Sequence, residues 1–312
     1  MGLLPFFGSS VSFTPSTDIP SLKGKVILVT GGNSGLGKQS VLEFARHGPD
    51  LIWLAARDAQ KATAAIDDIR KEVPGASIRH LELDLASFDS VKHAARTVLA
   101  ESNRLDVLME NAGIMAAPPA LTKEGYELQF GTNHVGHALL TRLLMPLLLK
   151  TAATPGADVR VVVLSSMGVT LAPAGGIQFD KLKTKCEEMS SWVRYGQSKV
   201  ANALFARQLA KEHRELTVAA VHPGGVNTNL GHFMKEQSAL LNRLYSLASL
   251  VLATVETGAR NQLWASVAND VVSGEYYVPI GVRNKGPATI RDDVLAKKLW
   301  DWTEEELKGQ EV

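Results

Sequence analysis

VILVTGGNSGLG, residues 26–37, joins a short apolar run to a glycine-rich turn. The run from Val26 to Val29 has the length and branching of a buried parallel strand. Glycines at 31, 35 and 37 allow the backbone to turn sharply and to approach a pyrophosphate. The helix that begins behind them would supply free N–H groups and partial positive charge. A glycine-rich turn without a ligand is the alternative, but this strand-to-helix position favours a nucleotide site.

A regular alternation of strands and helices continues on the C-terminal side of this turn. Apolar runs predict strands at 51–54, 77–83, 106–109, 159–164 and 216–221. Helices are predicted up to residue 47, at 59–72, around 91–100, through 139–149 and around 200–212. This alternation predicts an α/β fold, a Rossmann-type doubly wound parallel sheet with helices on both faces. We expect an irregular leader at 1–22, a single domain at 23–290 and a helical tail at 291–312.

Two segments interrupt the alternation, at 167–194 and 229–252. Both follow predicted strand ends, where open α/β sheets bind their ligands. The second segment carries Leu240, Leu244, Leu247 and Val251 at helical spacing. It is interpreted as a lid over an apolar substrate, with a core helix or a helix on a membrane surface as alternatives.

Composition and charge narrow the class of protein. The 312 residues are 45% hydrophobic, enough for one large domain. The chain has 33 basic and 32 acidic residues, so it offers no reason to expect a nucleic-acid partner. Cys186 is the single cysteine, which excludes an intrachain disulfide and fits a reducing compartment. The apolar run 138–149 is too short to cross a bilayer. We therefore expect a cytoplasmic protein without an integral membrane segment, and leave peripheral membrane association and a homodimer open.

Several motifs follow one another along the chain: Thr30-Gly-x-x-x-Gly-x-Gly37, Asp84-Leu85, Asn111-Ala-Gly113, Asn133, Ser166, Tyr195 with Lys199, and Pro223-Gly224 with Thr228. Their spacing and order resemble the short-chain dehydrogenase/reductase family over about residues 23–280. The likeness is greatest to retinol-dehydrogenase and WW-domain-oxidoreductase relatives and to fungal secondary-metabolism reductases. Glu110 departs from the pattern, because many members have asparagine there. The positions that are expected to bind the cofactor are Gly31, Asn33, Ser34, Gly35, Leu36, Gly37, Lys38, Arg57, Asp84, Leu85, Asn111, Ala112, Gly113, Tyr195, Lys199, Pro223, Gly224, Val226 and Thr228.

The residues at the end of the second predicted strand indicate whether the chain binds NAD or NADP. A carboxylate there would select NAD through the ribose hydroxyls, but the family's acidic position aligns with Ala56. Arg57 follows it, and a guanidinium can bind a 2′-phosphate with two hydrogen bonds. Lys38 is expected to add positive charge. NADP(H) is therefore predicted; alternatively, Arg57 is a solvated residue and Asp58 caps the next helix.

Tyr195 and Lys199 are spaced to lie on one helical face, one turn apart. The pKa of a free tyrosine is about 10, and a nearby ammonium is expected to lower it towards neutrality. The resemblance implies a catalytic set of Asn133, Ser166, Tyr195 and Lys199. It implies that Lys199 also holds the ribose, that Asn133 positions a water and that Ser166 contacts the substrate oxygen. Ser165 remains an alternative to Ser166.

These residues indicate an NADPH-dependent oxidoreductase that reduces a ketone or aldehyde. The resemblance implies a lipophilic substrate, such as a retinoid, steroid or polyketide. An NAD-dependent alcohol dehydrogenase and a non-catalytic NADP(H) sensor or scaffold are the alternatives. His134 and His137 lie three residues apart, but no third ligand accompanies them, so no metal site is predicted.

Overall fold

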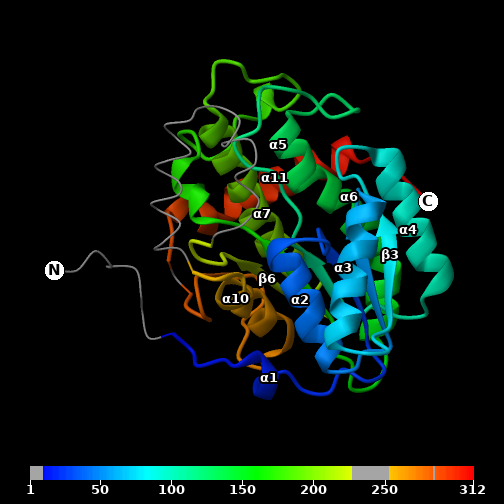
Figure 1. Cartoon of the computed structure of the whole chain (residues 1–312). Coiled ribbons are helices and arrows are strands. Elements are labelled where there is room, and N and C mark those ends of the chain that lie inside the picture. Colours follow the sequence, from blue (N-terminus) through cyan, green and yellow to red (C-terminus); the bar gives the residue numbers. More distant parts are fainter. Residues whose placement is uncertain (1–9, 227–252, 284) are drawn as a thin grey trace, which may run out of the picture.

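A seven-stranded parallel sheet forms the middle layer of the molecule, in the order β3-β2-β1-β4-β5-β6-β7. The computed structural model (Figure 1) describes residues 10–226, 253–283 and 285–312. The strands are β1 (Val26–Thr30), β2 (Leu51–Ala56), β3 (Ile78–Glu82), β4 (Val107–Glu110), β5 (Arg160–Leu164), β6 (Thr217–Val221) and β7 (Tyr276–Tyr277). The order reverses at β1 and β4, so this is the doubly wound sheet that the alternation predicts.

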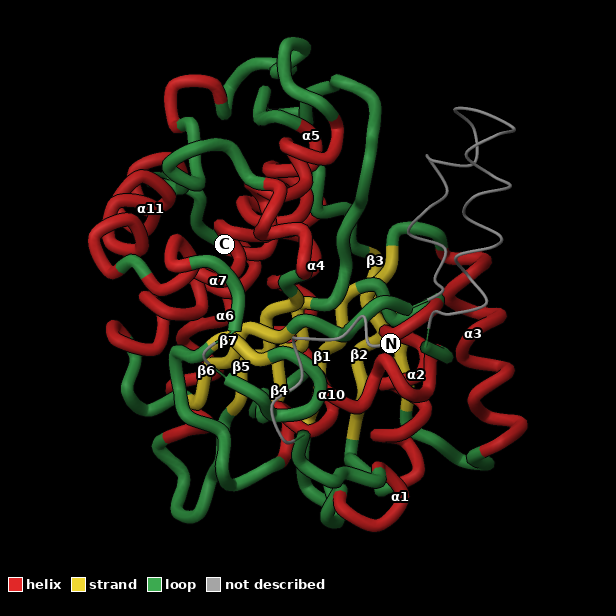
Figure 2. Tube along the Cα trace, turned by 90° about the vertical axis from the view of Figure 1, so that its left-hand side faces the viewer, coloured by secondary structure: helices red, strands yellow, loops and turns green. Residues whose placement is uncertain are grey.

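Helices cover both faces of the sheet. Figure 2 shows α4, α6, α7 and α11 on one side and α1, α2 and α10 on the other. The α-helices of the described residues are α1 (Pro15–Asp18), α2 (Gly35–Arg46), α3 (Ala59–Glu72), α4 (Phe88–Glu101), α5 (Leu128–Phe130), α6 (Gly136–Ala152), α7 (Ser191–Glu212), α10 (Val255–Val267) and α11 (Asp293–Glu306). Shorter helical turns are the π-helix Gly131–Val135 and the 3₁₀ turns Met167–Leu171, Phe179–Lys181 and Ala288–Arg291. None of the described helices is long and apolar enough to cross a bilayer.

Strand β1 shows why the central strands are apolar throughout. Val26 and Leu28 join the core beneath α4, α6 and α7, whereas Ile27 and Val29 join the opposite core with α2 and α10. Successive side chains point to opposite faces, so a strand buried on both faces needs apolar residues at every position.

The N-terminal and C-terminal segments contribute more to the cores than sequence patterns indicate. Residues 1–22 are predicted as irregular, but α1 forms a helical turn, and Phe13, Ile19 and Leu22 are buried in the α2–α10 core. At the other end, α11 lies within the predicted tail, and Trp300 stacks on Phe205 with ring centroids 5.7 Å apart. The 229–252 segment, with its predicted lid, lies outside the described residues.

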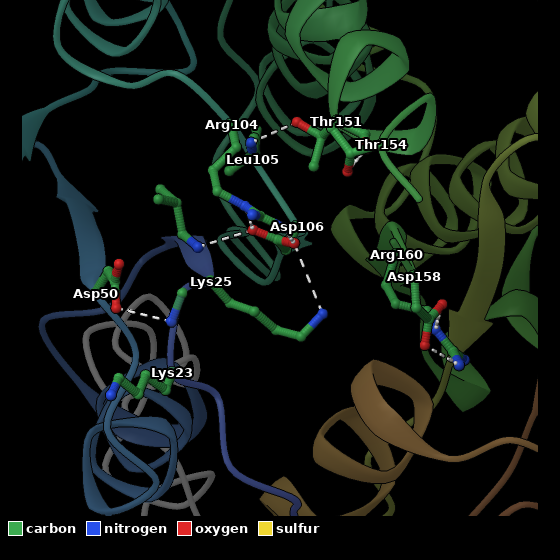
Figure 3. A network of polar contacts seen from close by, with 12 residues as sticks. Lys23, Lys25, Asp50, Arg104, Leu105, Asp106, Thr151, Thr154, Asp158 and Arg160 are labelled. Carbon is green, nitrogen blue, oxygen red and sulfur yellow. Dashed lines mark hydrogen bonds and ion pairs between the residues drawn. The ribbon is translucent and has the colours of Figure 1, made fainter. Parts of the chain in front are cut away.

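A buried aspartate holds the amino ends of β1 and β4 together (Figure 3). Asp106 is fully buried and accepts hydrogen bonds from the Val26 N–H at 2.9 Å and from the Arg104 guanidinium at 2.6 and 2.8 Å. The Lys25 ammonium lies 3.6 Å from the same carboxylate. The two central strands are therefore fixed at this edge, and their carboxyl ends lie at the opposite edge.

A second buried ion pair fixes the start of α7. The Arg194 guanidinium lies 2.8 Å from the Glu127 carboxylate, with side-chain exposures of 1% and 0%. Arg194 also donates to the Ala117 carbonyl at 2.9 Å, and Glu127 accepts from the Phe130 N–H at 2.7 Å. The pair therefore joins α7 to α5 and to the loop after β4, one residue before Tyr195.

Replacing Glu127 by glutamine should destabilise the protein strongly. The substitution leaves the Arg194 charge buried without a counter-charge, which costs about 3–5 kcal/mol of unfolding free energy. The matched control is Glu101→Gln, which breaks the Arg79–Glu101 pair, 59% and 46% exposed, and should cost less than about 1 kcal/mol. Urea denaturation measures both values, and equal losses in the two variants would show that the buried pair has no special role.

Candidate active site

A cavity of about 550 Å³ opens at the carboxyl ends of the central strands. Its walls come from the segments that follow β1 to β6 and from α7. It brings together most of the residues that the sequence predicts for cofactor and substrate. Those that line it are Gly31, Asn33, Ser34, Gly35, Leu36, Arg57, Asp84, Leu85, Asn111, Ala112, Gly113, Ser166, Tyr195, Lys199, Pro223, Gly224 and Val226. Thr228 lies outside the described residues.

The glycine turn packs too closely to admit side chains. Gly31 has φ +67°, a conformation that L-residues rarely adopt. A Cβ on Gly37 would lie 2.3 Å from the Gly31 carbonyl oxygen and 2.5 Å from the Asn111 amide nitrogen. Gly37 therefore does not line the cavity itself, but its missing side chain allows the first turn of α2 to close against β1. The free N–H groups of that helical turn lie at the cavity wall formed by residues 33–36.

Asn111 and Thr30 join the ends of β1 and β4. The Asn111 amide donates to the Thr30 carbonyl at 2.8 Å, and the Thr30 hydroxyl accepts from the Ala112 N–H at 2.9 Å. These two side chains therefore hold the segments that follow β1 and β4 together at one edge of the cavity.

The segment after β2 brings a cation, Arg57, and a carboxylate, Asp58, to the cavity wall. Ala56 is the last residue of β2, and Arg57 is exposed and lines the cavity. Asp58 caps α3 by accepting from the Lys61 N–H at 3.0 Å, as the alternative interpretation of this stretch expects. Lys38 does not line the cavity, because its ammonium pairs with Asp68 at 2.8 Å. Lys61, which the sequence did not single out, also lines the cavity, and its ammonium lies 3.3 Å from the Asp58 carboxylate.

Tyr195 and Lys199 lie together at the inner wall of the cavity, on α7. Both are almost fully buried, and the Lys199 ammonium lies 5.8 Å from the centre of the Tyr195 ring. The ammonium donates to the Leu164 carbonyl at 2.9 Å, which fixes it at the end of β5. A lysine ammonium has three donors, so this contact leaves two for other partners.

The pKa of Tyr195 differs from the sequence expectation. Burial raises it, and a hydrogen bond with Ser166 opposes the rise without reversing it. The expected lowering by Lys199 is therefore wrong: the loss of water around the phenolate is the largest effect on this pKa, and the group that opposes it is Ser166. Burial also lowers the pKa of Lys199 to about 8, against the opposing effect of the Glu110 carboxylate.

The two serines after β5 have different surroundings. The Ser165 hydroxyl is buried and donates to the Lys199 carbonyl at 2.7 Å. Ser166 is partly exposed, and its hydroxyl oxygen accepts from the Gly168 N–H at 3.0 Å. Ser165 thus has a hydrogen bond to the α7 backbone, and Ser166 faces Tyr195.

Asn133 lies behind the cavity wall, in the π-helix that precedes α6. Its side chain is fully buried; it accepts from the Ile114 N–H at 2.8 Å and donates to the Ser198 hydroxyl at 2.9 Å. π-Helical turns are frequent at functional sites, and this one breaks the regular backbone ladder beside α7. The structure therefore places Asn133 next to α7, which carries Tyr195 and Lys199, without placing it on the cavity surface.

The two histidines of this region bind hydroxyl groups. His134 Nε2 lies 3.1 Å from the Thr303 hydroxyl, and His137 Nε2 lies 2.9 Å from the Thr30 hydroxyl. Burial lowers the pKa of His134 to about 3 and that of His137 to about 4, so both rings are neutral at pH 7.

His222 and Tyr276 belong to the site but have no clear sequence signal. His222 lines the cavity, and its Nδ1 accepts from the Met167 N–H at 3.3 Å. The Tyr276 hydroxyl donates to the Ser166 carbonyl at 3.2 Å. His222 directly precedes the Pro223-Gly224 pair, which could have marked it. Tyr276 lies on a two-residue strand, too short to show any periodicity.

Comparisons with known proteins agree with this geometry. A family model described as short chain dehydrogenase matches residues 25–178. The chain is 40% identical to the short-chain dehydrogenase/reductase drtF of Aspergillus calidoustus, over 94% of this chain and 97% of that protein. It is 37% identical to human retinol dehydrogenase 13, over 90% of this chain and 83% of that protein.

A solved structure from Mycobacterium paratuberculosis shares the fold. It superposes with a TM-score of 0.71 at 31% identity and covers 93% of this chain and 96% of its own. These similarities extend over nearly the whole chain. They include the doubly wound sheet, the glycine turn after β1 and the segment of α7 with Tyr195 and Lys199. The protein belongs to the short-chain dehydrogenase/reductase family, whose members are oxidoreductases that use a nicotinamide cofactor.

Proposed function

We propose that this protein is an NADPH-dependent reductase that converts a ketone or aldehyde on a lipophilic small molecule to the alcohol. The observation that carries the proposal is the position of the Tyr195 hydroxyl. It faces Ser166, which lowers the Tyr195 pKa against the larger effect of burial, and it adjoins Lys199 at the inner wall of a cavity formed by the strand ends.

The cavity fits a dinucleotide along its length. Gly31 and Gly37 let the backbone approach a pyrophosphate at the N-terminus of α2, where partial positive charge favours phosphate. Ala56 offers no carboxylate to select the ribose hydroxyls of NAD, while Arg57 offers a charge that suits a 2′-phosphate. These features support NADP(H), with Lys199 as a donor to the nicotinamide ribose.

Bound NADPH would supply a hydride to the carbonyl carbon of the substrate. Ser166 and Tyr195 would hold the carbonyl oxygen, and Tyr195 would donate its proton to the developing alkoxide. The raised pKa of Tyr195 keeps the phenol protonated before reaction, as a general acid requires. The Lys199 ammonium would then stabilise the phenolate that remains.

Apolar side chains near Tyr195 support a lipophilic substrate. Ile114 and Met115 line the cavity. Trp192 lies one turn before Tyr195, with ring centroids 6.4 Å apart, and its side chain remains 38% exposed. Leu171 is 46% exposed at the end of the turn that begins after Ser166. The retinol dehydrogenase relative is consistent with such a substrate.

Tyr195→Phe should leave the fold and NADPH affinity nearly unchanged, because the ring still packs and only one hydroxyl is lost. Turnover should fall by at least about a hundredfold, the usual effect of removing a general acid. The measurement is single-turnover hydride transfer at saturating NADPH with a ketone and aldehyde panel, alongside NADPH affinity by fluorescence. Near-normal hydride transfer would refute the mechanism and favour the sensor or scaffold function.

Lys199→Met should reduce both turnover and NADPH affinity, because it removes the charge beside Tyr195 and a ribose donor. Tyr195 and Lys199 are proposed to act as one unit, so the double variant should lose less activity than the product of the two separate losses. The same single-turnover and fluorescence assays test this, and independent, multiplicative losses would argue against a shared role.

Arg57→Ala should weaken NADPH binding by about 10- to 150-fold and leave NADH binding almost unchanged. The expected loss corresponds to about 1.5–3 kcal/mol for hydrogen bonds to a charged group. Lys71→Ala is the control, since Lys71 is an exposed α3 cation that does not line the cavity. Equal losses for the two cofactors would contradict the assignment of Arg57 to the 2′-phosphate.

A further inference from the structure

Glu110 is a buried carboxyl group that the proposed mechanism does not use. It is the last residue of β4, with 1% exposure, at the position where the sequence departs from the family pattern. One carboxylate oxygen, Oε1, accepts a hydrogen bond from the Thr141 hydroxyl of α6. The other, Oε2, has no hydrogen-bond partner among the described residues. Burying such a group is costly, so its presence needs an explanation.

The backbone places Glu110 beside the segments that surround the Lys199 ammonium. Glu110 pairs in register with Val163 of β5, and the next residue of β5 is Leu164, whose carbonyl accepts from Lys199. A Cβ on Gly113, three residues after Glu110, would lie 3.4 Å from the Lys199 nitrogen. Glu110 contacts Thr141 of α6, and Lys199 belongs to α7, a helix that shares one core with α6. The carboxyl group and the ammonium therefore lie on the same face of the sheet, although no ion pair within 4 Å joins them among the described residues.

We propose that Glu110 is a positioning residue that supplies the counter-charge for the Lys199 ammonium, and that it thereby sets the alkaline limit of the enzyme's working pH range. This proposal rests on the proposed function, in which Lys199 must be charged to stabilise the phenolate of Tyr195.

Glu110 and Lys199 influence each other. Burial raises the pKa of Glu110 to about 7, opposed by the Thr141 hydrogen bond and by Lys199. Burial lowers the pKa of Lys199 to about 8, opposed by Glu110. Below pH 7 the carboxyl is largely neutral and the ammonium stays charged without it. Above pH 7 the carboxylate forms, and its attraction delays the loss of the ammonium's proton.

The other titratable side chains around the pair do not change charge in this range. His137 of α6 and His222 after β6 have pKa values of about 4 because they are buried, so both are neutral from pH 6 upwards. Burial raises the pKa of Tyr195 on α7 and of Tyr276 on β7 above the ordinary value, so both phenols stay protonated. Glu110 is thus the described neighbour that gains a negative charge as the pH passes neutrality.

Glu110→Gln tests the proposal through the pH profile. Glutamine resembles the protonated carboxyl, so kcat/KM at pH 6 should stay within about twofold of the original enzyme. At higher pH the variant lacks the carboxylate, so the fall of kcat/KM at high pH, the alkaline limb of the profile, should begin at lower pH. We expect a shift of at least about half a pH unit, which corresponds to a loss of about threefold in kcat/KM at pH 8.5. The assay follows reduction of the fastest carbonyl in the panel at saturating NADPH. Glu43→Gln, another buried glutamate but on α2, is the control and should not shift the limb.

A second variant and an activity-free measurement accompany this test. Thr141→Val keeps the glutamate but removes a donor to its carboxylate, so the alkaline limb should move in the same direction by a smaller amount. Infrared pH-difference spectra of the ligand-free protein should show a protonated carboxyl that titrates near pH 7 and is missing in Glu110→Gln. If Glu110→Gln does not fold, the pH profile of Thr141→Val decides the question, and the infrared band is assigned by its shift to higher pH in that variant, since the Thr141 hydrogen bond lowers the pKa of Glu110.

The outcomes distinguish a failure of the proposed role of Glu110 from a failure of the proposed reductase function. An unshifted alkaline limb in both variants, or an equal loss at every pH, would overturn the role of Glu110, even where Tyr195→Phe is inactive. An active Tyr195→Phe enzyme would overturn the proposed function itself, whatever the profile of Glu110→Gln.

Discussion

The hydrogen bond between the Thr30 hydroxyl and His137 joins the end of β1, where the glycine turn begins, to α6. His137 in turn binds the Asn133 carbonyl through Nδ1 at 3.0 Å. The Asn133 amide donates to the Ser198 hydroxyl, which donates to the Tyr195 carbonyl at 2.7 Å. A continuous series of buried polar contacts therefore runs from the end of β1 through the π-helix to α7. Buried polar groups of this kind need hydrogen-bond partners, so the positions of the glycine turn and of α7 depend on each other.

Much of the fold could be predicted because its signals are local. Val26 to Val29 is apolar throughout, since a central parallel strand is buried on both faces. The residues from Ala59 to Glu72 show helical periodicity, and the helix has those bounds. The short strand β7 and the packing of Phe13 in the α2–α10 core could not be predicted in this way. Both depend on surfaces provided by residues far away in the sequence.

The candidate site shows the same division. Gly31 and Gly37 could be assigned to the strand-to-helix junction, because a close approach of two backbone segments requires glycine at defined spacings. Ion pairs between residues far apart in the sequence require no particular motif. The sequence therefore predicts Lys38 at the cofactor, whereas in the structure it pairs with Asp68. The pKa of Tyr195 was expected to fall because helical spacing reveals its neighbour Lys199 but not the depth of its burial. The amino-acid composition does not identify the substrate.

The strand order also governs how the chain can assemble during synthesis. Residues 26–110 contain all of β1 to β4, and these four strands are neighbours in the sheet. Once a ribosome has released this part, it can pair its strands and close the glycine turn before α7 exists. Until β5 is made, however, β4 is an open edge of buried, mostly apolar residues, which invites pairing with other chains. Until the later strands are synthesised, the growing sheet therefore keeps an open edge of this kind, first at β4 and then at β5, which exposes the nascent chain to aggregation.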